Sequence, residues 1–326
     1  MNHLQQYLVD EFVEDYQEGH LSRREALRRL AGVMGAPAAA QLLAACGQPA
    51  QQAAQPTAEA PAATAAPAAT EAPAATEAPA ATAAPATGSV NVAPDDPSIV
   101  AEAVEFPGAD ATLRGYLARP AAEGTYPIVL VCHENRGLTP HIEDVTRRVA
   151  KAGYVGLAVD LLSREGGTAQ VTDAASIPGL LSSAPPERHV QDFADGLAFV
   201  KRQPYARADR AGMVGFCFGG GVTWLVAAGV PELRAAVPFY GPPAPAEQLP
   251  QVNAAVLAIY AENDQRINQS IPMVEAAMQQ AGKTYQKIIY PGVDHAFHND
   301  TGQRYNAEAA QAAWAETMNW FGTHLA

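Results

Sequence analysis

The sequence predicts an α/β fold with a doubly wound, mostly parallel sheet in the part of the chain after about residue 95. Two observations predict this fold. Short strand-like segments alternate there with segments of helical periodicity, and this alternation is typical of parallel strands joined by helices. One segment, 128–132, is apolar throughout, as expected of a buried strand. In such sheets, catalytic and ligand sites form at the carboxyl ends of the strands.

The expected elements follow one another from residue 113 to the end of the chain. We expect strands at 113–118, 128–132, 154–159, 213–216, 236–240, 255–260 and 286–290. We expect helices at 144–152, at 186–202, directly after Cys217 and at 307–324. The last helix carries one apolar stripe, formed by Ala310, Trp314, Met318 and Phe321. Residues 95–326 are therefore expected to form one domain with a sizeable core.

Charge and cysteine usage exclude several classes of protein. The 326-residue chain has a formal net charge of −13 and no basic stripe, so a nucleic-acid partner is not expected. The three cysteines, Cys46, Cys132 and Cys217, lie far apart in different contexts, which argues against a disulfide framework. No CxxC or HExxH pattern occurs, so a metal site is not expected.

The first 46 residues are expected to be an export signal. A basic cluster that begins at Ser22-Arg23-Arg24 precedes an uncharged run over residues 30–45, which is too short to span a bilayer stably. The run ends in Leu43-Ala44-Ala45-Cys46, which resembles a bacterial lipobox. We therefore expect lipidation at Cys46 and anchoring on the outer face of a bacterial membrane. The alternatives are secretion or a periplasmic location through a Tat-type signal, and an amphipathic helix without export.

Residues 47–94 are expected to be a disordered linker. From residue 59 to residue 87 the sequence Glu-Ala-Pro-Ala-Ala-Thr repeats with small variations. Frequent proline disfavours helix and favours extended segments, and strong hydrophobes are too few to form a core. A spacer of this kind suits a catalytic domain that an acylated Cys46 holds at a membrane surface.

The segment Gly215-Phe216-Cys217-Phe218-Gly219-Gly220 carries the strongest chemical signal in the chain. It has the G-x-S-x-G form with cysteine in place of serine, after an expected strand and before an expected helix. A nucleophile there lies on a strained turn, where flanking side chains would collide with neighbouring elements. The amino end of the helix favours the thiolate. Cys217 is therefore the expected nucleophile of an α/β-hydrolase.

Two polar loops after Cys217 contain its expected partners. In α/β-hydrolases the order along the chain is nucleophile, acid, histidine. Asp264 follows one expected strand and His295 follows the next, so they are expected as the acid and the base. Glu262 and His298 are the competing residues in the same loops.

Four segments of the chain, taken together, resemble one known family. They are His133-Glu134-Asn135-Arg136-Gly137-Leu138, the segment 215–220, Tyr260-Ala261-Glu262-Asn263-Asp264 and Asp294-His295-Ala296-Phe297-His298. In this order, with cysteine as the nucleophile, they resemble the dienelactone hydrolase family over about residues 100–326. The resemblance implies a triad of Cys217, His295 and Asp264. It also implies that Glu134 gates the thiol until substrate displaces it, since a nearby carboxylate disfavours the thiolate.

The remaining expected site residues bind the substrate. Two backbone N–H groups, those of Phe218 and Asn135, are expected to form the oxyanion hole. Arg136 and Tyr240 are expected substrate contacts. The cycle is expected to need no cofactor.

The expected activity is hydrolysis of small-molecule carboxylic esters or lactones through an acyl-cysteine intermediate. Family members that act on dienelactone carry an arginine four residues after the catalytic histidine, whereas Asn299 stands there in this chain. The natural substrate therefore stays open, with Arg136 or Arg304 as a candidate replacement. A thioesterase or an esterase of xenobiotic esters is an alternative on the same fold. A tethered binding protein without turnover is the alternative from a different class.

Overall fold

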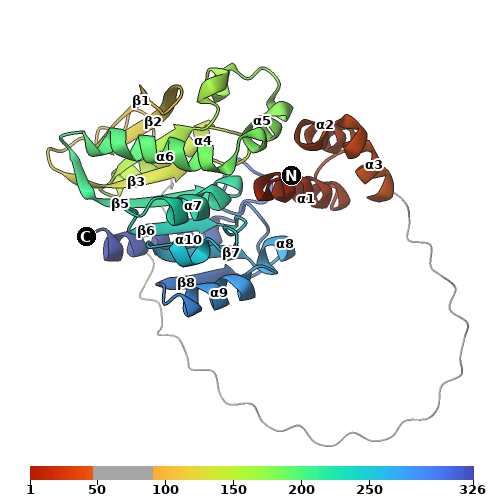
Figure 1. The fold of residues 1–326 in the computed structure, drawn as a ribbon. Helices are drawn as coiled ribbons and strands as arrows, with labels where there is room; N and C mark the ends of the chain where they lie inside the picture. The colour runs from red at the N-terminus through yellow and green to blue at the C-terminus, as the bar shows by residue number, and fades with distance from the viewer. Residues whose placement is uncertain (47–90) are drawn as a thin grey trace, which may run out of the picture.

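The computed structural model describes residues 1–46 and 91–326, and an eight-strand sheet forms its centre (Figure 1). The strands lie in the order β1-β2-β4-β3-β5-β6-β7-β8. Their bounds are β1 Ile99–Pro107, β2 Thr112–Pro120, β3 Tyr126–Cys132, β4 Val155–Asp160, β5 Ala206–Phe216, β6 Ala235–Phe239, β7 Ala255–Ala261 and β8 Tyr285–Tyr290. β3 to β8 are parallel, whereas β1 and β2 pair in antiparallel fashion. The mostly parallel sheet and the α/β-hydrolase fold that the sequence predicts are therefore confirmed.

Helices cover both faces of the sheet (Figure 1). Those of residues 91–326 are α4 Pro140–Lys151, α5 Ile177–Ser183, α6 Pro186–Lys201, α7 Phe218–Gly229, α8 Gln265–Asn268, α9 Ile271–Gln280 and α10 Ala307–His324. Helices α6 and α7 pack on one face and on each other, and α4 and α10 pack on the opposite face. Because the central strands are covered on both sides, every residue of β4 and β7 is buried.

Several elements differ from those the sequence predicts. Strand β1 was not expected, because it is an outer strand whose residues 100–105 are exposed or half-buried. Strand β5 begins well before the expected segment 213–216, since its first half is charged and partly exposed. Helix α4 begins at Pro140 rather than at residue 144. In each case polar residues hide the apolar pattern in the sequence, and strand pairing or helix packing stabilises the element.

The first 46 residues form three helices that pack against the rest of the protein (Figure 1). They are α1 His3–Gln17, α2 Arg23–Met34 and α3 Ala36–Cys46. Capping boxes begin α1 and α2, with Asn2 and Ser22 as the N-caps. The segment that we expected to act as an export signal thus lies on the catalytic domain. Within the described residues no helix combines the length and the apolar character that a membrane crossing needs.

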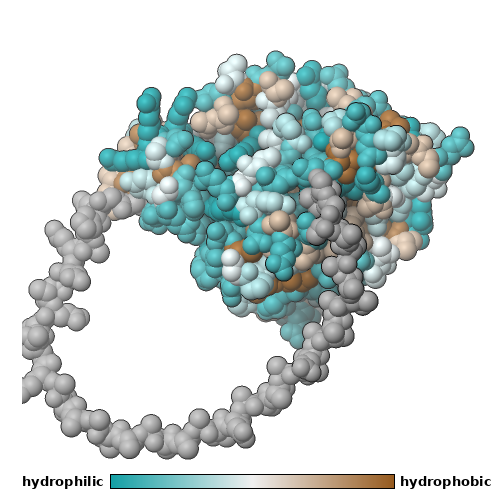
Figure 2. Space-filling model, turned by 180° about the vertical axis from the view of Figure 1, so that it is seen from behind, coloured by the Kyte–Doolittle hydropathy of each residue, from teal (hydrophilic) through white to brown (hydrophobic). Residues whose placement is uncertain are grey.

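Most of the expected linker, residues 47–90, lies outside the described residues. Its last four residues, 91–94, belong to the domain. The Val92 backbone N–H donates to Asp144 Oδ1 at 2.7 Å, and Arg147 Nε donates to the Val92 carbonyl oxygen at 2.6 Å. On the face opposite to that of Figure 1 the surface is mostly hydrophilic, with hydrophobic residues in small separate groups (Figure 2).

Candidate active site

Cys217 lies in the turn between β5 and α7, with φ 57° and ψ −121°. Two glycines make this turn possible. A Cβ atom on Gly219 would lie 2.7 Å from the Cys132 carbonyl oxygen, and one on Gly215 would lie 2.7 Å from the Gly219 carbonyl carbon. Since real side chains do not approach so closely, the turn requires glycine on both sides of the cysteine. It leaves the thiol at the carboxyl end of the sheet, beside the first turn of α7.

Residues with positive φ angles cluster around Cys217. Among the described residues, the non-glycine residues with positive φ are Cys217, Tyr240 at 35° and Ala296 at 65°. Tyr240 follows β6, and its ring meets that of His295 edge-on at 5.0 Å. Backbone strain of this kind persists where the surrounding structure holds it, and it clusters at functional sites.

His295 and Asp264 form a buried hydrogen-bonded pair. His295 Nδ1 and Asp264 Oδ2 lie 2.6 Å apart, and both side chains are almost fully buried. Asp264 follows β7 and caps α8, accepting from the Ile267 backbone N–H at 3.2 Å. With its Nδ1 donating to the carboxylate, the His295 ring directs Nε2 towards the cysteine. The structure therefore brings Cys217, Asp264 and His295 together from three separate loops.

The charges of the pair shift both pKa values. Burial lowers the pKa of His295, but the charge of Asp264 and the hydrogen bond to it together raise that pKa well above its usual value. Burial raises the pKa of Asp264, and the charge and hydrogen bond of His295 more than reverse this, so the pKa is lowered. The Asp264 carboxylate thus stabilises the imidazolium that forms when His295 takes up a proton.

The competing residues lie elsewhere. Glu262 is exposed and accepts from the Gly292 backbone N–H at 2.7 Å. His298 is buried, and its ring stacks on that of Phe216 at 4.8 Å between centroids. Burial lowers the pKa of His298 well below its usual value, so that its ring is neutral.

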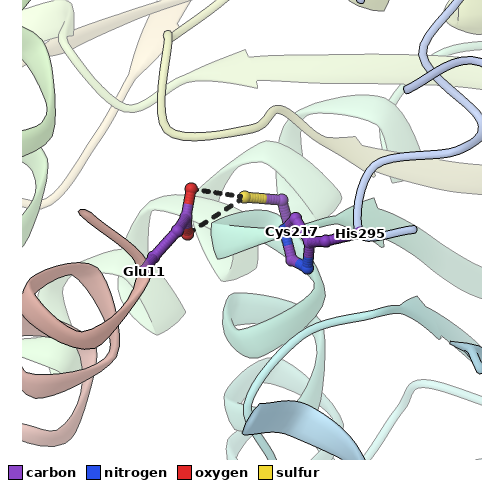
Figure 3. A group of neighbouring side chains, drawn as sticks. All are labelled: Glu11, Cys217 and His295. Atoms are coloured by element: carbon purple, nitrogen blue, oxygen red, sulfur yellow. Dashed lines mark hydrogen bonds between the residues drawn. The ribbon is translucent and has the colours of Figure 1, made fainter. Parts of the chain in front are cut away.

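Helix α1 places two side chains on the thiol. The Tyr7 hydroxyl lies 3.2 Å from Cys217 Sγ and 3.4 Å from His295 Nε2. The Glu11 carboxylate oxygens lie 3.7 and 3.9 Å from the same sulfur and accept from the thiol (Figure 3). The sequence did not point to either residue. The available signal was the helical spacing of Leu4, Leu8 and Phe12, which marks a buried face of α1.

Burial and Glu11 act together on the thiol. Burial raises the pKa of Cys217, the charge of Glu11 raises it further, and the hydrogen bond and charge of His295 lower it by less. The charge of Glu134, the expected gate, also raises this pKa, but its effect is smaller than those of burial, Glu11 and His295. Its carboxylate accepts a hydrogen bond from Asn299 Nδ2 at 2.5 Å, whereas the thiol is bound by Tyr7 and Glu11.

The other expected site residues surround the same place. Phe218 begins α7 directly after the cysteine. The Asn135 side chain donates to Glu11 Oε1 at 2.8 Å. Arg136 is exposed, and Arg304 donates to Asp15 Oδ1 of α1 at 3.0 Å.

A pocket of about 320 Å³ lies between the N-terminal helices and the carboxyl end of the sheet. Its lining from α1 and α2 includes Glu11, Asp15, Glu25 and Arg29, and its lining from the domain includes Glu134, Asn135, Arg136, Cys217, His295, Asn299 and Arg304. The pocket is polar and charged, and Cys217 is part of its lining.

One donor set at this site has the chemistry to hold a metal ion. The ligand atoms of Glu11, Cys217 and His295 lie within 4.8 Å of one another, and all three residues are buried. Carboxylate, thiolate and imidazole are ligand types that zinc accepts. The Tyr7 hydroxyl is also in contact with the sulfur and the imidazole. A metal here would occupy the nucleophile and its base.

Comparison with known proteins adds a family to this geometry. The model of the dienelactone hydrolase family matches residues 113–325. A Methylorubrum extorquens protein named as a carboxymethylenebutenolidase is 36% identical over 242 residues, which cover 71% of this chain and 83% of that protein. An Escherichia coli protein of the same name is 35% identical over 243 residues, which cover 70% and 88%.

A solved structure agrees with these relatives. A Klebsiella pneumoniae protein described as a dienelactone hydrolase shares 32% sequence identity with a TM-score of 0.64, and the match covers 69% of this chain and 98% of that chain. The family match includes every site residue described above except those from α1 and α2.

Proposed function

Because the chain belongs to the dienelactone hydrolase family, we propose that it hydrolyses carboxylic esters or lactones with Cys217 as the nucleophile. Membership makes the protein a hydrolase of ester or lactone bonds that acts on small molecules. The observation that supports the triad most strongly is the 2.6 Å pair of His295 Nδ1 and Asp264 Oδ2, with Nε2 directed to the sulfur side.

The first half of the cycle forms an acyl-enzyme. The Cys217 thiol gives its proton to His295 Nε2, and the sulfur attacks the carbonyl carbon of the ester or lactone. The N–H groups of Phe218 and Asn135 stabilise the oxyanion of the tetrahedral intermediate. The carbon–oxygen bond to the leaving group then breaks, and the alkoxide takes the proton from His295. A thioester on Cys217 and a free hydroxyl group result.

The second half of the cycle releases the acid. Neutral His295 accepts a proton from water, and the hydroxide attacks the thioester carbon. The carbon–sulfur bond breaks, the thiolate regains the proton from His295, and the carboxylic acid leaves. Asp264 keeps its proton-free form throughout and holds the imidazole in the required orientation.

Substrate contacts are proposed for Arg136 and Tyr240. Arg136 is exposed and lines the pocket at Cys217. Asn299 stands where dienelactone-cleaving members have an arginine, and its amide is bound to Glu134. Arg304 is bound to Asp15. The proposed substrate class is therefore esters and lactones in general, and a substrate carboxylate has Arg136 as its partner.

We further propose that the protein is exported and lipid-anchored through Cys46. The support is the position of the cysteine after the uncharged run 30–45 and before the repeat segment. Labelling cells with a palmitate analogue tests this proposal. The label is expected in the full chain and lost in Cys46→Ala; a label that persists in Cys46→Ala overturns it.

The catalytic proposal is tested by ester hydrolysis. The chain is assayed intact and after cutting within residues 47–90, because α1 lies on the thiol. Substrates are p-nitrophenyl acetate, a panel of lactones and an acyl thioester. The cut chain is expected to hydrolyse an oxygen ester or lactone, and Cys217→Ala is expected to abolish this. Activity that survives in Cys217→Ala, or turnover of the thioester alone, overturns the proposal.

A further inference from the structure

We propose that residues 1–46 are an intramolecular inhibitor, in which the acidic face of α1 occupies the place of the substrate on Cys217. The binding partner of this catalytic cleft is thus an acidic amphipathic helix of the same chain. The inference rests on the proposed function only in taking Cys217 as the nucleophile. A cut anywhere between α3 and β1 separates the inhibitor from the domain.

The helix blocks the reacting atoms themselves. A carbonyl carbon must approach the nucleophile to about 3–3.5 Å for attack. The Tyr7 hydroxyl already lies 3.2 Å from Sγ and 3.4 Å from His295 Nε2, in contact with both the nucleophile and its base. The Glu11 carboxylate fills the adjoining side at 3.7 Å (Figure 3). Only 3% of Cys217 is exposed, so an acyl group and α1 cannot occupy the site together.

Charged contacts match the helix to the cleft. Glu11, Glu14 and Asp15 follow at spacings of three and four residues and share one face of α1. Glu14 accepts from Arg266 Nε at 2.9 Å, and Asp15 accepts from Arg304 Nη1 at 3.0 Å. The Arg266 guanidinium also lies 4.6 Å from the centre of the Tyr7 ring. Glu11 accepts a hydrogen bond from Asn135. Each of these three acidic side chains therefore has a hydrogen-bond partner in the domain.

Apolar contacts fix the position of the three helices. Leu4, Leu8 and Phe12 are fully buried under α1. The second helix crosses α5 so closely that the backbones meet at Gly32 and Gly179. Burial of each large apolar side chain is worth about 1.5–3 kcal/mol, so this cluster stabilises the docked position of the helices by several kcal/mol. The helices therefore have enough buried surface to stay closed.

The chemistry of the thiol fits a resting state. The charge of Glu11 disfavours the thiolate and keeps the proton on sulfur. A protonated thiol is a weak nucleophile and resists oxidation. Cleavage at the lipobox-like segment would remove residues 1–45, which are the three helices up to their last residue. Hydrolysis of one peptide bond would then free the site.

The glycine pair offers a matched test in the full chain. A Cβ atom on Gly179 would lie 2.7 Å from the Gly32 carbonyl carbon and closer still to its oxygen, whereas a Cβ atom on Gly32 would meet only the Gly179 Cα, at 3.8 Å. Gly179→Ala therefore pushes α2 away, and Gly32→Ala leaves the docking intact. Neither glycine belongs to the catalytic machinery.

The readout is alkylation of Cys217 by iodoacetamide, followed by mass spectrometry of its peptide. Buried Cys132 serves as the internal reference in each digest. We expect alkylation of Cys217 to be at least about tenfold faster in Gly179→Ala than in the wild type, since each tenfold step needs only about 1.4 kcal/mol of lost docking. Gly32→Ala is expected to match the wild type. Equal rates in all three chains overturn the proposal.

A second experiment tests the inhibitor without the Gly179→Ala substitution. A chain cut within residues 47–90 and freed of residues 1–46 is expected to react with iodoacetamide and with p-nitrophenyl acetate faster than the intact chain. A peptide of residues 1–22 is expected to restore inhibition, and the same peptide with Tyr7→Ala and Glu11→Ala is the control.

The outcomes separate the two proposals. Faster alkylation without hydrolysis of any ester supports the inhibitor and overturns the proposed function. Faster alkylation with loss of an esterase activity present in the intact chain shows that α1 belongs to the working site, and overturns the inhibitor. A cut chain that reacts no faster than the intact chain overturns it as well.

Discussion

The Asn299 amide donates a 2.5 Å hydrogen bond to Glu134. Glu134 thereby points to a partner on the loop after His295, while Glu11 from α1 takes the contact with the Cys217 thiol. The charges of both carboxylates raise the pKa of the Cys217 thiol, that of Glu11 by more. In the proposed inhibited state, Glu11 of the N-terminal helix shares the gating role that the family resemblance implies for Glu134.

The two carboxylates should differ in their effect on the thiol. Removing the charge of Glu11 or Glu134 lowers the pKa of Cys217, because both charges raise it. Glu11→Gln is expected to shift the midpoint of the alkylation rate against pH downward, and Glu134→Gln to shift it downward by less. Each glutamine keeps the size of the side chain and its acceptor oxygen. The reverse order of the two midpoints would contradict the contact between Glu11 and the sulfur.

Two substitutions test whether Asp264 or the nearby Glu262 is the acid of the proposed triad. Asp264→Asn removes the charge that holds the His295 imidazole and is expected to lower kcat of the cut chain roughly 10⁴-fold. Glu262→Gln is the control, since Glu262 is exposed and bound to the Gly292 N–H. Its kcat should stay within about twofold of the wild type. A larger loss in Glu262→Gln than in Asp264→Asn would exchange the roles of the two acids.

The turn at the nucleophile should not accept a methyl group. Gly219→Ala would press a Cβ atom on the Cys132 and His133 carbonyl oxygens, and we expect a loss of about 3 kcal/mol in the free energy of unfolding. Gly322→Ala places the same group in open space on the exposed side of α10 and should stabilise by about 1 kcal/mol. Urea denaturation measures both. Similar values for the two variants would argue against the close packing of the turn.

A buried histidine makes stability depend on pH. His189 is fully buried, its Nε2 donates to the Leu181 carbonyl oxygen, and burial lowers its pKa to about 3. The unfolded chain binds the proton near pH 6.5 and the folded chain does not, so stability is full above about 6.5 and falls as the pH decreases towards 3.

This dependence can be measured against an exposed histidine. Between about pH 7 and about pH 5, His189 alone contributes a loss of about 2 kcal/mol, which His189→Gln should remove. His20→Gln should leave the dependence unchanged, because the His20 side chain is 40% exposed. Identical slopes of unfolding free energy against pH in the wild type and His189→Gln would disprove the lowered pKa of His189.

Much of the fold and of the site within residues 113–326 is predictable from the sequence because both follow from local rules. Apolar segments such as 128–132 become central strands, since only strands covered on both faces tolerate continuous apolar sequence. The glycines around Cys217 mark the turn, and the strand ends mark the loops of Asp264 and His295. The outer strand β1 was missed because its pairing with β2, and not its own pattern, stabilises it.

The contribution of α1 was not predictable because it is a long-range contact. Tyr7 and Glu11 lie more than 200 residues from Cys217 in the sequence. Their helix carries both charged and apolar residues, and this mixture is equally typical of a signal segment or a surface helix. The docking of that helix on the cleft is therefore visible only in the structure.

The N-terminal helices and the thiol beneath them belong to one polypeptide. Closure is therefore unimolecular, and its equilibrium constant contains no protein concentration, unlike inhibition by a separate protein. Diluting the intact chain leaves its specific activity unchanged, whereas a ligand or surface that binds only the open form shifts the population by mass action. Each copy would thus keep the same low activity whether few or many copies are present, until the connecting chain is cut.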